Sequence, residues 1–286
     1  MKVGLVLEGG SMRGMYTAGI LDVMMENGIE VDGAIGVSAG ALFGCNYKSR
    51  QIGRAIRYNM QYCNDPRYVG MKNLLLTGDL YGAEFCYDIL PKTLDVFDSE
   101  AFRNNPMEFY VVCTNVVTGQ PVYRKCEKGL EDLQWFRASG SMPMVSRVVK
   151  VDGYQLLDGG IADSIPAKHF SEELGYQRSI VILTQPEGFV KEKNSLLPLL
   201  KAWLWNHPNT YAALATRHDR YNEALRYVAQ REKSGEFFVI RPSRKLEVGA
   251  VEHDPQKLKV VYDLGRADAE KKLEALKTFI AESKAL

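Results

Sequence analysis

The first fifty residues alternate short apolar runs with amphipathic segments, and glycines stand at the joins. Lys2–Leu7 and Val31–Val37 are apolar runs of strand length, whereas Met12–Glu26 and Ala39–Tyr47 carry apolar residues at helical spacing. The order strand–loop–helix–strand–turn–helix is typical of parallel strands joined by helices. We therefore predict a three-layer α/β/α fold with a mostly parallel central sheet.

The rest of the chain supplies further strands and a closing helix. Phe109–Val117 and Pro121–Lys125 flank Thr118-Gly119-Gln120 and predict a hairpin. Glycines and prolines interrupt residues 65–98, which are expected to be less regular. No Gly/Ser/Pro-rich linker divides the chain, so we expect one domain over residues 1–286, with a motif-bearing core at about 3–184 and a completing segment at 185–286. Other expected strands are Val148–Leu157, Arg178–Thr184 and Phe237–Arg241, and other expected helices are Ile52–Cys63, Leu130–Ser139 and Pro255–Lys284.

The composition limits the binding partners and the cellular location that the sequence predicts. The formal net charge of +1 gives no overall attraction to nucleic acid, so no nucleic-acid partner is expected. The N-terminal apolar run is too short for a signal peptide, and Glu8 interrupts it. The five cysteines form no C-x-x-C pair and favour reduced thiols in the cytoplasm. Peripheral contact with the inner membrane face stays open, as does the oligomeric state. No grouping has metal-ligand spacing, and no cofactor is expected.

The segment Gly36-Val37-Ser38-Ala39-Gly40 follows a predicted strand and opens a predicted helix. That context is typical of a nucleophile elbow, in which flanking glycines allow a sharp turn and the serine hydroxyl is exposed. The positive end of the following helix favours a developing alkoxide. The pattern alone is also common in plain tight turns.

A second loop joins strand and helix at Glu8-Gly9-Gly10-Ser11-Met12-Arg13-Gly14. Consecutive backbone N–H groups in such a loop suit an oxyanion. A phosphate-binding loop or a simple turn is the alternative, but the spacing matches neither G-x-x-x-x-G-K-[ST] nor G-x-G-x-x-G. Arg13 either braces the loop, neutralises a phosphate or is an ordinary surface residue.

Asp158 ends an apolar run and is followed by Gly159 and Gly160. An aspartate in this position is often only a turn residue. As a base for Ser38 it would need a partly apolar site, because the reference pKa of a free carboxyl is only about 3.9.

Two alternatives remain. A Ser-His-Asp triad would need a histidine, but none of the four lies in a motif that marks a triad member; His169 and His253 are the positions to test. A non-catalytic lipid- or nucleotide-binding module that uses the glycine loop is the second.

The three segments together resemble the patatin-like phospholipase family, in particular its small bacterial members. The family motifs G-G-x-x-[RK]-G, G-x-S-x-G and D-G-[GA] match Gly9 to Gly14, Gly36 to Gly40 and Asp158 to Gly160, in the family's order. Ala138-Ser139-Gly140-Ser141-Met142-Pro143 and Ser164-Ile165-Pro166 also resemble family elements. The likeness covers roughly Val3 to Thr184.

The resemblance implies a serine acyl hydrolase that cleaves lipid acyl esters, of phospholipase A, lysophospholipase or carboxylester type. It implies Ser38 as nucleophile, Asp158 as base, no histidine, and an oxyanion hole at Gly9, Gly10 and Ser11 that Arg13 and Gly14 support. Ser11 departs from the third glycine that many members have, and Glu8 stands where aspartate is frequent.

The substrate is less constrained than the chemistry. The apolar and aromatic segment at residues 196–205 is either a lid that contacts lipid or a helix packed on the core. Leu74-Leu75-Leu76 and Tyr81 are candidates for the border of an acyl pocket. The sequence leaves the head group, the acyl-chain length, the positional specificity and the physiological role undetermined.

Overall fold

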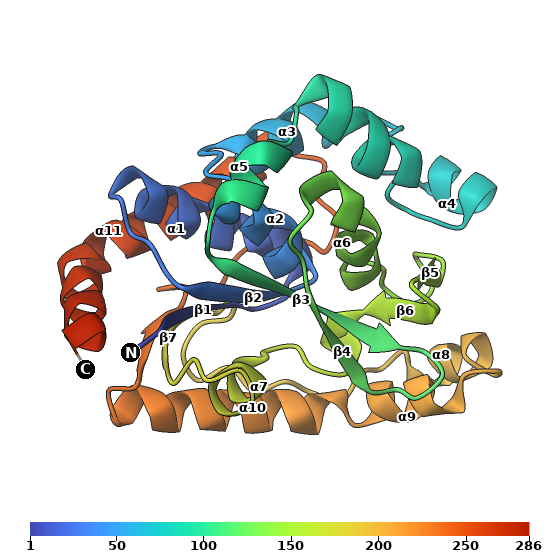
Figure 1. Ribbon diagram of the computed structural model, residues 1–286. Helices are drawn as coiled ribbons and strands as arrows, with labels where there is room; N and C mark the ends of the chain where they lie inside the picture. Colours follow the sequence, from blue (N-terminus) through green and yellow to red (C-terminus); the bar gives the residue numbers. More distant parts are fainter. Residues whose placement is uncertain (286) are drawn as a thin grey trace.

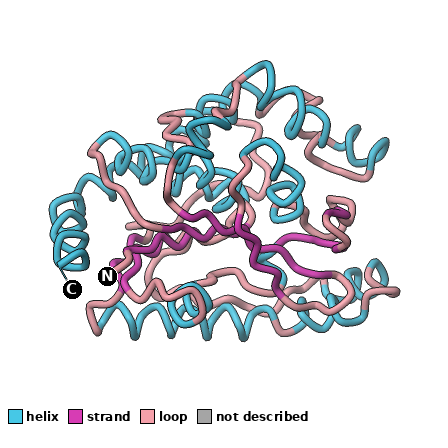
Figure 2. Tube along the Cα trace, viewed as in Figure 1, coloured by secondary structure: helices cyan, strands magenta, loops and turns pink. Residues whose placement is uncertain are grey.

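The computed structural model describes residues 1–285 and contains one eight-stranded sheet between two layers of helices (Figures 1 and 2). The strand order is β5-β6-β3-β2-β1-β7-β8, with β4 paired to β3. The predicted α/β/α class is confirmed. The strands are β1 (Val3–Leu7), β2 (Gly33–Val37), β3 (Glu108–Asn115), β4 (Pro121–Lys125), β5 (Val149–Val151), β6 (Tyr154–Asp158), β7 (Arg178–Ile182) and β8 (Phe237–Ile240).

The central strands β3, β2, β1, β7 and β8 are parallel, and β4, β5 and β6 are antiparallel to their neighbours. The predicted hairpin is confirmed as the β3–β4 pair, in which Cys113 faces Val122. β1 and β2 read as uninterrupted apolar runs because both faces of these strands are buried.

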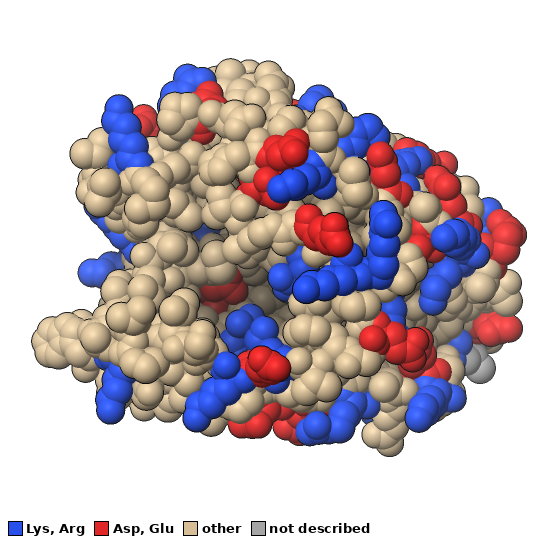
Figure 3. Space-filling view, turned by 180° about the vertical axis from the view of Figure 1, so that it is seen from behind, with Lys and Arg blue, Asp and Glu red and all other residues tan. Residues whose placement is uncertain are grey.

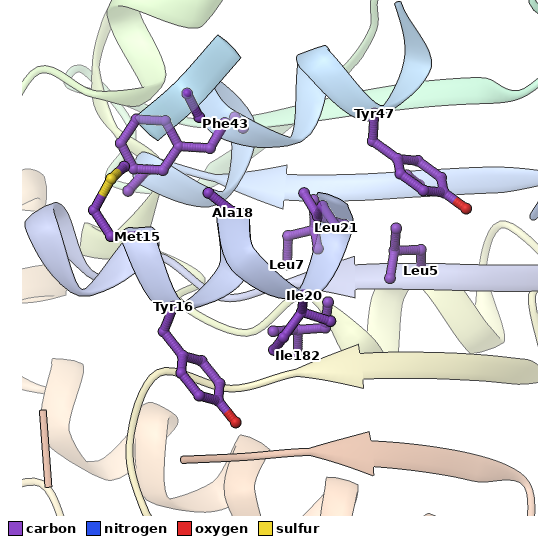
Figure 4. Packing of buried hydrophobic residues seen from close by; sticks show 14 of the residues in the cluster. Leu5, Leu7, Met15, Tyr16, Ala18, Ile20, Leu21, Phe43, Tyr47 and Ile182 are labelled. Carbon is purple, nitrogen blue, oxygen red and sulfur yellow. The ribbon is translucent and has the colours of Figure 1, made fainter. Parts of the chain in front are cut away.

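Side chains of β1 alternate between the two faces of the sheet. Leu5 and Leu7 pack with α1 and α2 on one face, whereas Val6 packs with α7 and α10 on the other. Figure 4 shows the first core, with Tyr16 and Phe43 over the strands. The helices are α1 (Gly14–Glu26), α2 (Ala39–Lys48), α3 (Arg54–Tyr62), α4 (Met71–Thr77), α5 (Ser99–Asn104), α6 (Leu133–Ser139), α7 (Ala167–Glu172), α8 (Leu197–Trp203), α9 (Pro208–Ala215), α10 (Arg217–Lys233) and α11 (Pro255–Ala285).

The segment expected to be irregular, residues 65–98, contains α4 and a π-helix, η2 (Phe85–Leu94), which includes Pro91. Proline has no N–H, and the wider π-helical pattern accommodates it here. The segment expected to be less regular therefore contains two helical stretches, one of which is π-helical. Three short 3₁₀ helices complete the list: η1 (Ser11–Arg13), η3 (Gly129–Asp132) and η4 (Gly159–Ile161).

The segment at residues 196–205 forms α8 and its flanks, and it is amphipathic. Leu197, Leu200 and Leu204 are buried against β6 and α9, whereas Leu199 and Trp205 are exposed. The expected packing on the core is confirmed for one face, and the lid stays a prediction for the exposed face. Among residues 1–285, no helix combines the length and the apolar character needed to cross a bilayer.

Candidate active site

Ser38 occupies the turn between β2 and α2, at the carboxyl edge of the sheet. Its backbone angles, φ 53° and ψ −124°, are strained for any residue that carries a side chain. Gly40 permits the turn because a Cβ there would overlap the carbonyl oxygen of Leu7 on β1. A strained strand-to-helix turn of this kind is the geometry of a nucleophile elbow.

The register of β3 brings Asp158 to Ser38. Residues 110–112 of β3 pair with both β2 and β4, and residues 113 and 114 pair with both β4 and β6. A strand has two edges, and β4 occupies one edge of β3. β2 and β6 therefore both pair with the other edge, one after the other along its length. Val37 lies opposite Val112 and Asp158 opposite Cys113, so the two strands end at adjoining positions.

The Asp158 carboxyl is buried, and its Oδ1 accepts the N–H of Gly160 at 2.7 Å. Burial raises the pKa of Asp158, and the neighbouring Ser38 hydroxyl, the Gly160 N–H and the charge of Arg217 oppose that rise. The carboxylate is therefore a stronger base than an exposed aspartate, which is what abstraction of a hydroxyl proton requires.

Gly159 allows the chain to turn sharply after Asp158. A Cβ at Gly159 would overlap the carbonyl oxygen of Val112, so only glycine lets η4 pass this close to β3. Gly36, on the other strand, lies against Ala41 of α2 in the same way. The predicted site glycines thus lie at close backbone approaches around the two side chains.

One short segment after α6 holds both partners in place. The Ser139 hydroxyl accepts the backbone N–H of Ser38 at 2.8 Å and donates to the Val112 carbonyl at 2.7 Å. Two residues on, the carbonyl oxygen of Ser141 accepts the N–H of Asp158 at 2.7 Å. These residues lie in the A-S-x-x-x-P stretch, whose role the sequence left unassigned.

The glycine-rich loop passes beside Ser38. A Cβ at Gly9 would lie 3.2 Å from the Cβ of Ser38. Within residues 1–285, the backbone N–H groups of Gly10 and Ser11 donate to no acceptor, so they are available to an oxyanion. Ser11 has a φ of 49°, the conformation that glycine adopts without strain. Gly14 packs against Ala39 and Phe43 at the start of α1.

Glu8 connects this loop to the segment after β7 and to α10. The carboxylate accepts the N–H of Thr184 at 2.6 Å and the hydroxyl of Tyr221, on α10, at 2.5 Å. Burial raises the pKa of Glu8 despite these bonds. The charge of Arg13 acts on the same carboxylate, and the Arg13 Nε is buried with no hydrogen-bond partner in the described chain.

An apolar cavity of about 130 Å³ opens beside Ser38 and Ser11. Tyr81 borders it as expected. The stretch Leu74-Leu75-Leu76 does not, and Leu75 and Leu76 are exposed on α4. A largely aromatic and aliphatic lining suits an acyl chain. Other lining residues are Leu42, Phe43, Tyr58, Tyr68, Tyr87, Leu90, Phe97 and Phe136.

None of the four histidines hydrogen bonds to Ser38 or Asp158 within the described residues. The ring of His169 stacks on Tyr123 with centroids 3.5 Å apart. His253 Nδ1 lies 2.7 Å from the carbonyl oxygen of Cys63, far from the elbow in sequence and in contacts. The geometry therefore offers Ser38 a carboxylate partner and no imidazole.

Sequence reasoning missed Arg217. Its Nε donates to the Gly160 carbonyl, and its Nη2 donates to the Ser164 hydroxyl at 3.3 Å. The side chain thus secures the chain directly after Asp158. No motif marks it, because its partners lie more than fifty residues away along the chain.

A family model for Patatin-like phospholipase matches residues 5–171, and a model for a domain of unknown function (DUF6363) matches residues 207–281. The chain is 26% identical over 271 residues to the uncharacterized protein YjjU of Escherichia coli, covering 93% of this chain and 75% of that protein. It is 27% identical over 175 residues to the lysophospholipase nte1 of Aspergillus oryzae, covering 59% of this chain and 11% of that protein.

Among solved structures, the crystal structure of VipD from Legionella pneumophila aligns with a TM-score of 0.46 and 14% identity, over 96% of this chain and 67% of that chain. The first family model spans more than half of the sequence and includes Ser38 and Asp158. The chain therefore belongs to the patatin-like phospholipase family and is a lipid-hydrolysing enzyme.

Proposed function

We propose that this enzyme is a serine acyl hydrolase in which Ser38 and Asp158 form a catalytic dyad and the N–H groups of Gly10 and Ser11 supply the oxyanion hole. The N–H of Gly9, the third predicted donor, is bonded to the Ser164 carbonyl oxygen at 3.5 Å. The observation that carries the proposal is the strand register that places the Ser38 elbow next to the buried Asp158 carboxyl, whose pKa burial raises, beside an apolar cavity. The free N–H groups of Gly10 and Ser11 support the oxyanion assignment.

The reaction follows from these positions. Ser38 Oγ attacks the ester carbonyl while Asp158 takes the hydroxyl proton. The loop N–H groups stabilise the tetrahedral oxyanion, Asp158 returns the proton to the leaving alcohol, and an acyl-enzyme remains. Water then gives a proton to Asp158 and attacks the acyl carbon; the carboxylic acid leaves and Ser38 Oγ regains its proton.

The proposed substrates are lipid acyl esters. The cavity beside Ser38 is lined mainly by carbon and takes the acyl chain, which places the ester carbonyl at the hydroxyl. The name of the Aspergillus relative, a lysophospholipase, agrees with a single-chain substrate.

Labelling with a fluorophosphonate, together with hydrolysis of acyl esters of graded length, tests the dyad. Ser38→Ala removes the nucleophile and is expected to abolish labelling, with a rate loss of about 10⁴-fold or more. Asp158→Asn removes the base and is expected to lose about 10²–10⁴-fold. His169→Ala is expected to retain activity, because its ring packs on Tyr123.

Ser146→Ala is the matched control, because Ser146 lines the same cavity and has no hydrogen bond to Asp158. Full ester hydrolysis by Asp158→Asn would overturn the dyad, and loss of activity in His169→Ala would point to a triad instead.

We further propose that the enzyme meets its substrate at a lipid surface through α4 and α8. The exposed fractions of Leu75, Leu76 and Trp205 are 80%, 71% and 81%, high for large apolar side chains. Both helices lie on the same side of the molecule (Figure 1), and uncharged surface protrudes there on both sides of a notch (Figure 3). Aromatic and leucine side chains on an amphipathic helix insert at bilayer interfaces.

Sedimentation with liposomes tests this contact. The pair Trp203→Ala with Trp205→Ala, and the pair Leu75→Ser with Leu76→Ser, are each expected to lower the bound fraction. Val260→Ser is the control, because Val260 is an apolar residue, 56% exposed, on the distant α11. Binding that is unchanged in both pairs would exclude this surface.

A further inference from the structure

Three basic side chains from separate parts of the chain lie near one another, and one of them, Arg217, acts on Asp158. Arg13 ends η1, Lys191 lies in the loop after β7, and Arg217 begins α10. The charges of Arg13 and Arg217 both act on Lys191, so the three groups lie within electrostatic range of one another. None of them lines the apolar cavity. The site thus has an apolar part and a separate cationic part.

The backbone of Lys191 is held by the side chain of Asn222. The backbone N–H of Lys191 donates to Asn222 Oδ1 at 2.8 Å, and its carbonyl oxygen accepts from Asn222 Nδ2 at 3.0 Å. This two-point attachment fixes the loop to α10. The ammonium group then lies 4.8 Å from the centre of the Tyr221 ring. Lys191 has no carboxylate partner within residues 1–285.

The three basic side chains outnumber the two carboxylates near them. Of two buried carboxylates, Glu8 interacts with Arg13, Lys191 and Arg217, and Asp158 interacts with Arg217. Glu8 already accepts hydrogen bonds from Thr184 and Tyr221, and Asp158 accepts one from Gly160. Partial burial and the charges of Arg217 and Arg13 lower the pKa of Lys191 to about 8. An anion in this place would relieve the repulsion.

We propose that Arg13, Lys191 and Arg217 (the cationic cluster) bind the phosphate of the substrate's head group while the acyl chain occupies the apolar cavity. The proposal rests on the proposed function, and it selects phosphate-bearing lipids over neutral acylglycerols. Lys191 and Arg217 lie outside residues 5–171, the part of the chain that matches the family model.

The chemistry of the three groups suits this ligand. Guanidinium and ammonium groups form charge-assisted hydrogen bonds with phosphate oxygens, and these are about twice as strong as neutral ones. The cluster adjoins the dyad through Arg217, which bonds Gly160 directly after Asp158. A phosphate here lies on the alcohol side of an ester whose acyl chain fills the cavity. Figure 3 shows Lys and Arg side chains beside a hollow in this face of the molecule.

Two substrates that differ only in the phosphate measure the effect. These are 1-octanoylglycerol 3-phosphate and 1-octanoylglycerol, compared at pH 7 by kcat/KM in wild type, Lys191→Gln and Lys193→Gln. Lys193 is the matched control, because it is exposed in the same loop two residues away. We expect wild type and Lys193→Gln to share a preference for the phosphate ester, and Lys191→Gln to lose about tenfold of it.

A binding measurement separates this proposal from the catalytic one. The ether analogues 1-O-octylglycerol 3-phosphate and 1-O-octylglycerol are titrated calorimetrically into Ser38→Ala and into Ser38→Ala with Lys191→Gln. Inorganic phosphate is titrated in parallel. Tighter binding of the ether phosphate that depends on Lys191 supports the subsite even if wild type hydrolyses neither ester, a result that would overturn only the proposed function.

Equal preference in Lys191→Gln and Lys193→Gln, with hydrolysis intact, would overturn the subsite alone. Inorganic phosphate that binds as tightly as the ether phosphate would overturn its assignment to a lipid head group.

Discussion

Individual residues of the site are held in conformations that side chains usually avoid. Ser38 and Ser11 both have positive φ, at 53° and 49°. At Ser38 the strain exposes the hydroxyl, so it serves the chemistry. At Ser11 the side chain only makes a weak contact with the Met142 sulfur at 3.8 Å. The strain at Ser11 therefore has no compensating bond of comparable strength.

Ser11→Gly is expected to stabilise the fold relative to Ser11→Ala. Alanine keeps the left-handed strain, which costs about 1–2 kcal/mol. Glycine removes this strain, but it loses more backbone entropy on folding, which offsets part of the stabilisation. Urea unfolding of the two variants measures the difference, with about 1 kcal/mol in favour of glycine expected. Equal stability would mean that Ser11 is not strained.

Asp158 shows how burial couples catalysis to stability. Its pKa is raised in the folded chain, so the folded state binds this proton more tightly than the unfolded state does. The contribution to stability is complete below the unfolded value of about 3.9 and is lost as the pH rises through the higher folded value. The ionised form that catalysis needs is the form that weakens the fold.

Asp158→Asn is accordingly expected to be more stable than wild type at pH 8, although it is inactive. The difference should shrink as the pH falls toward 4, where the wild-type carboxyl is protonated. Thermal unfolding across this range checks the sign. In wild type, the rate of fluorophosphonate labelling should rise with pH as Asp158 ionises, with its acid limb above the usual aspartate range. A less stable Asp158→Asn at pH 8 would contradict the prediction.

Among the helices, α10 contacts the site at three places. Tyr221 bonds Glu8, Arg217 bonds the turn after Asp158, and Asn222 holds the loop that carries Lys191. These three contacts come from the first two turns of one helix, and they reach the glycine loop, the Asp158 turn and the cationic cluster. The helix therefore couples parts of the site that are remote in sequence.

Tyr221→Phe is expected to lower the free energy of unfolding by about 1.5–3 kcal/mol, because it removes a hydrogen bond to a buried carboxylate. Tyr211→Phe on the neighbouring α9 is the control, because the Tyr211 hydroxyl makes no hydrogen bond within the described chain. Denaturant unfolding at pH 7 compares them. Equal losses would show that the bond to Glu8 contributes nothing.

The sequence predicted those elements whose signal is local. The run before Gly9 and the segments around Ser38 are short and strongly patterned, and the structure has β1, β2, α1 and α2 there. α10 was not predicted, because its surface is mostly charged and only Tyr221 and Val228 are buried. The roles of Arg217 and Ser139 depend on contacts that span 57 and 101 residues, which no local pattern encodes.

Across the whole molecule, the two ends of the chain meet. α11 crosses α1 so closely that a Cβ at Gly265 would overlap the Tyr16 carbonyl oxygen, and one at Gly19 would overlap that of Tyr262. Buried bonds from Tyr262 to Asp22 at 2.6 Å and from Tyr16 to Asp268 at 3.2 Å accompany the crossing. We propose that residues 1–286 form one domain, since β8 also extends the sheet of the motif-bearing core.

Gly265→Ala is expected to destabilise the protein by about 1–3 kcal/mol through overpacking. If the chain is one domain, circular dichroism and loss of Ser38 labelling should follow the same unfolding curve, shifted together. Glu282→Ala, exposed on the same helix, should leave both unchanged. A first transition in Gly265→Ala that spares the labelling would show that α11 belongs to a separate unit.

The shared edge of β3 has a consequence for refolding. The elbow around Ser38 is built from contacts close in sequence, but Asp158 reaches it only when β6 pairs beside β2, a closure over 120 residues. Contacts of such long range form slowly, because the loop entropy is lost before the pairing is gained. A refolding chain thus passes through forms with an intact elbow and no base, so that recovery of activity reports the arrival of β6 rather than the first collapse.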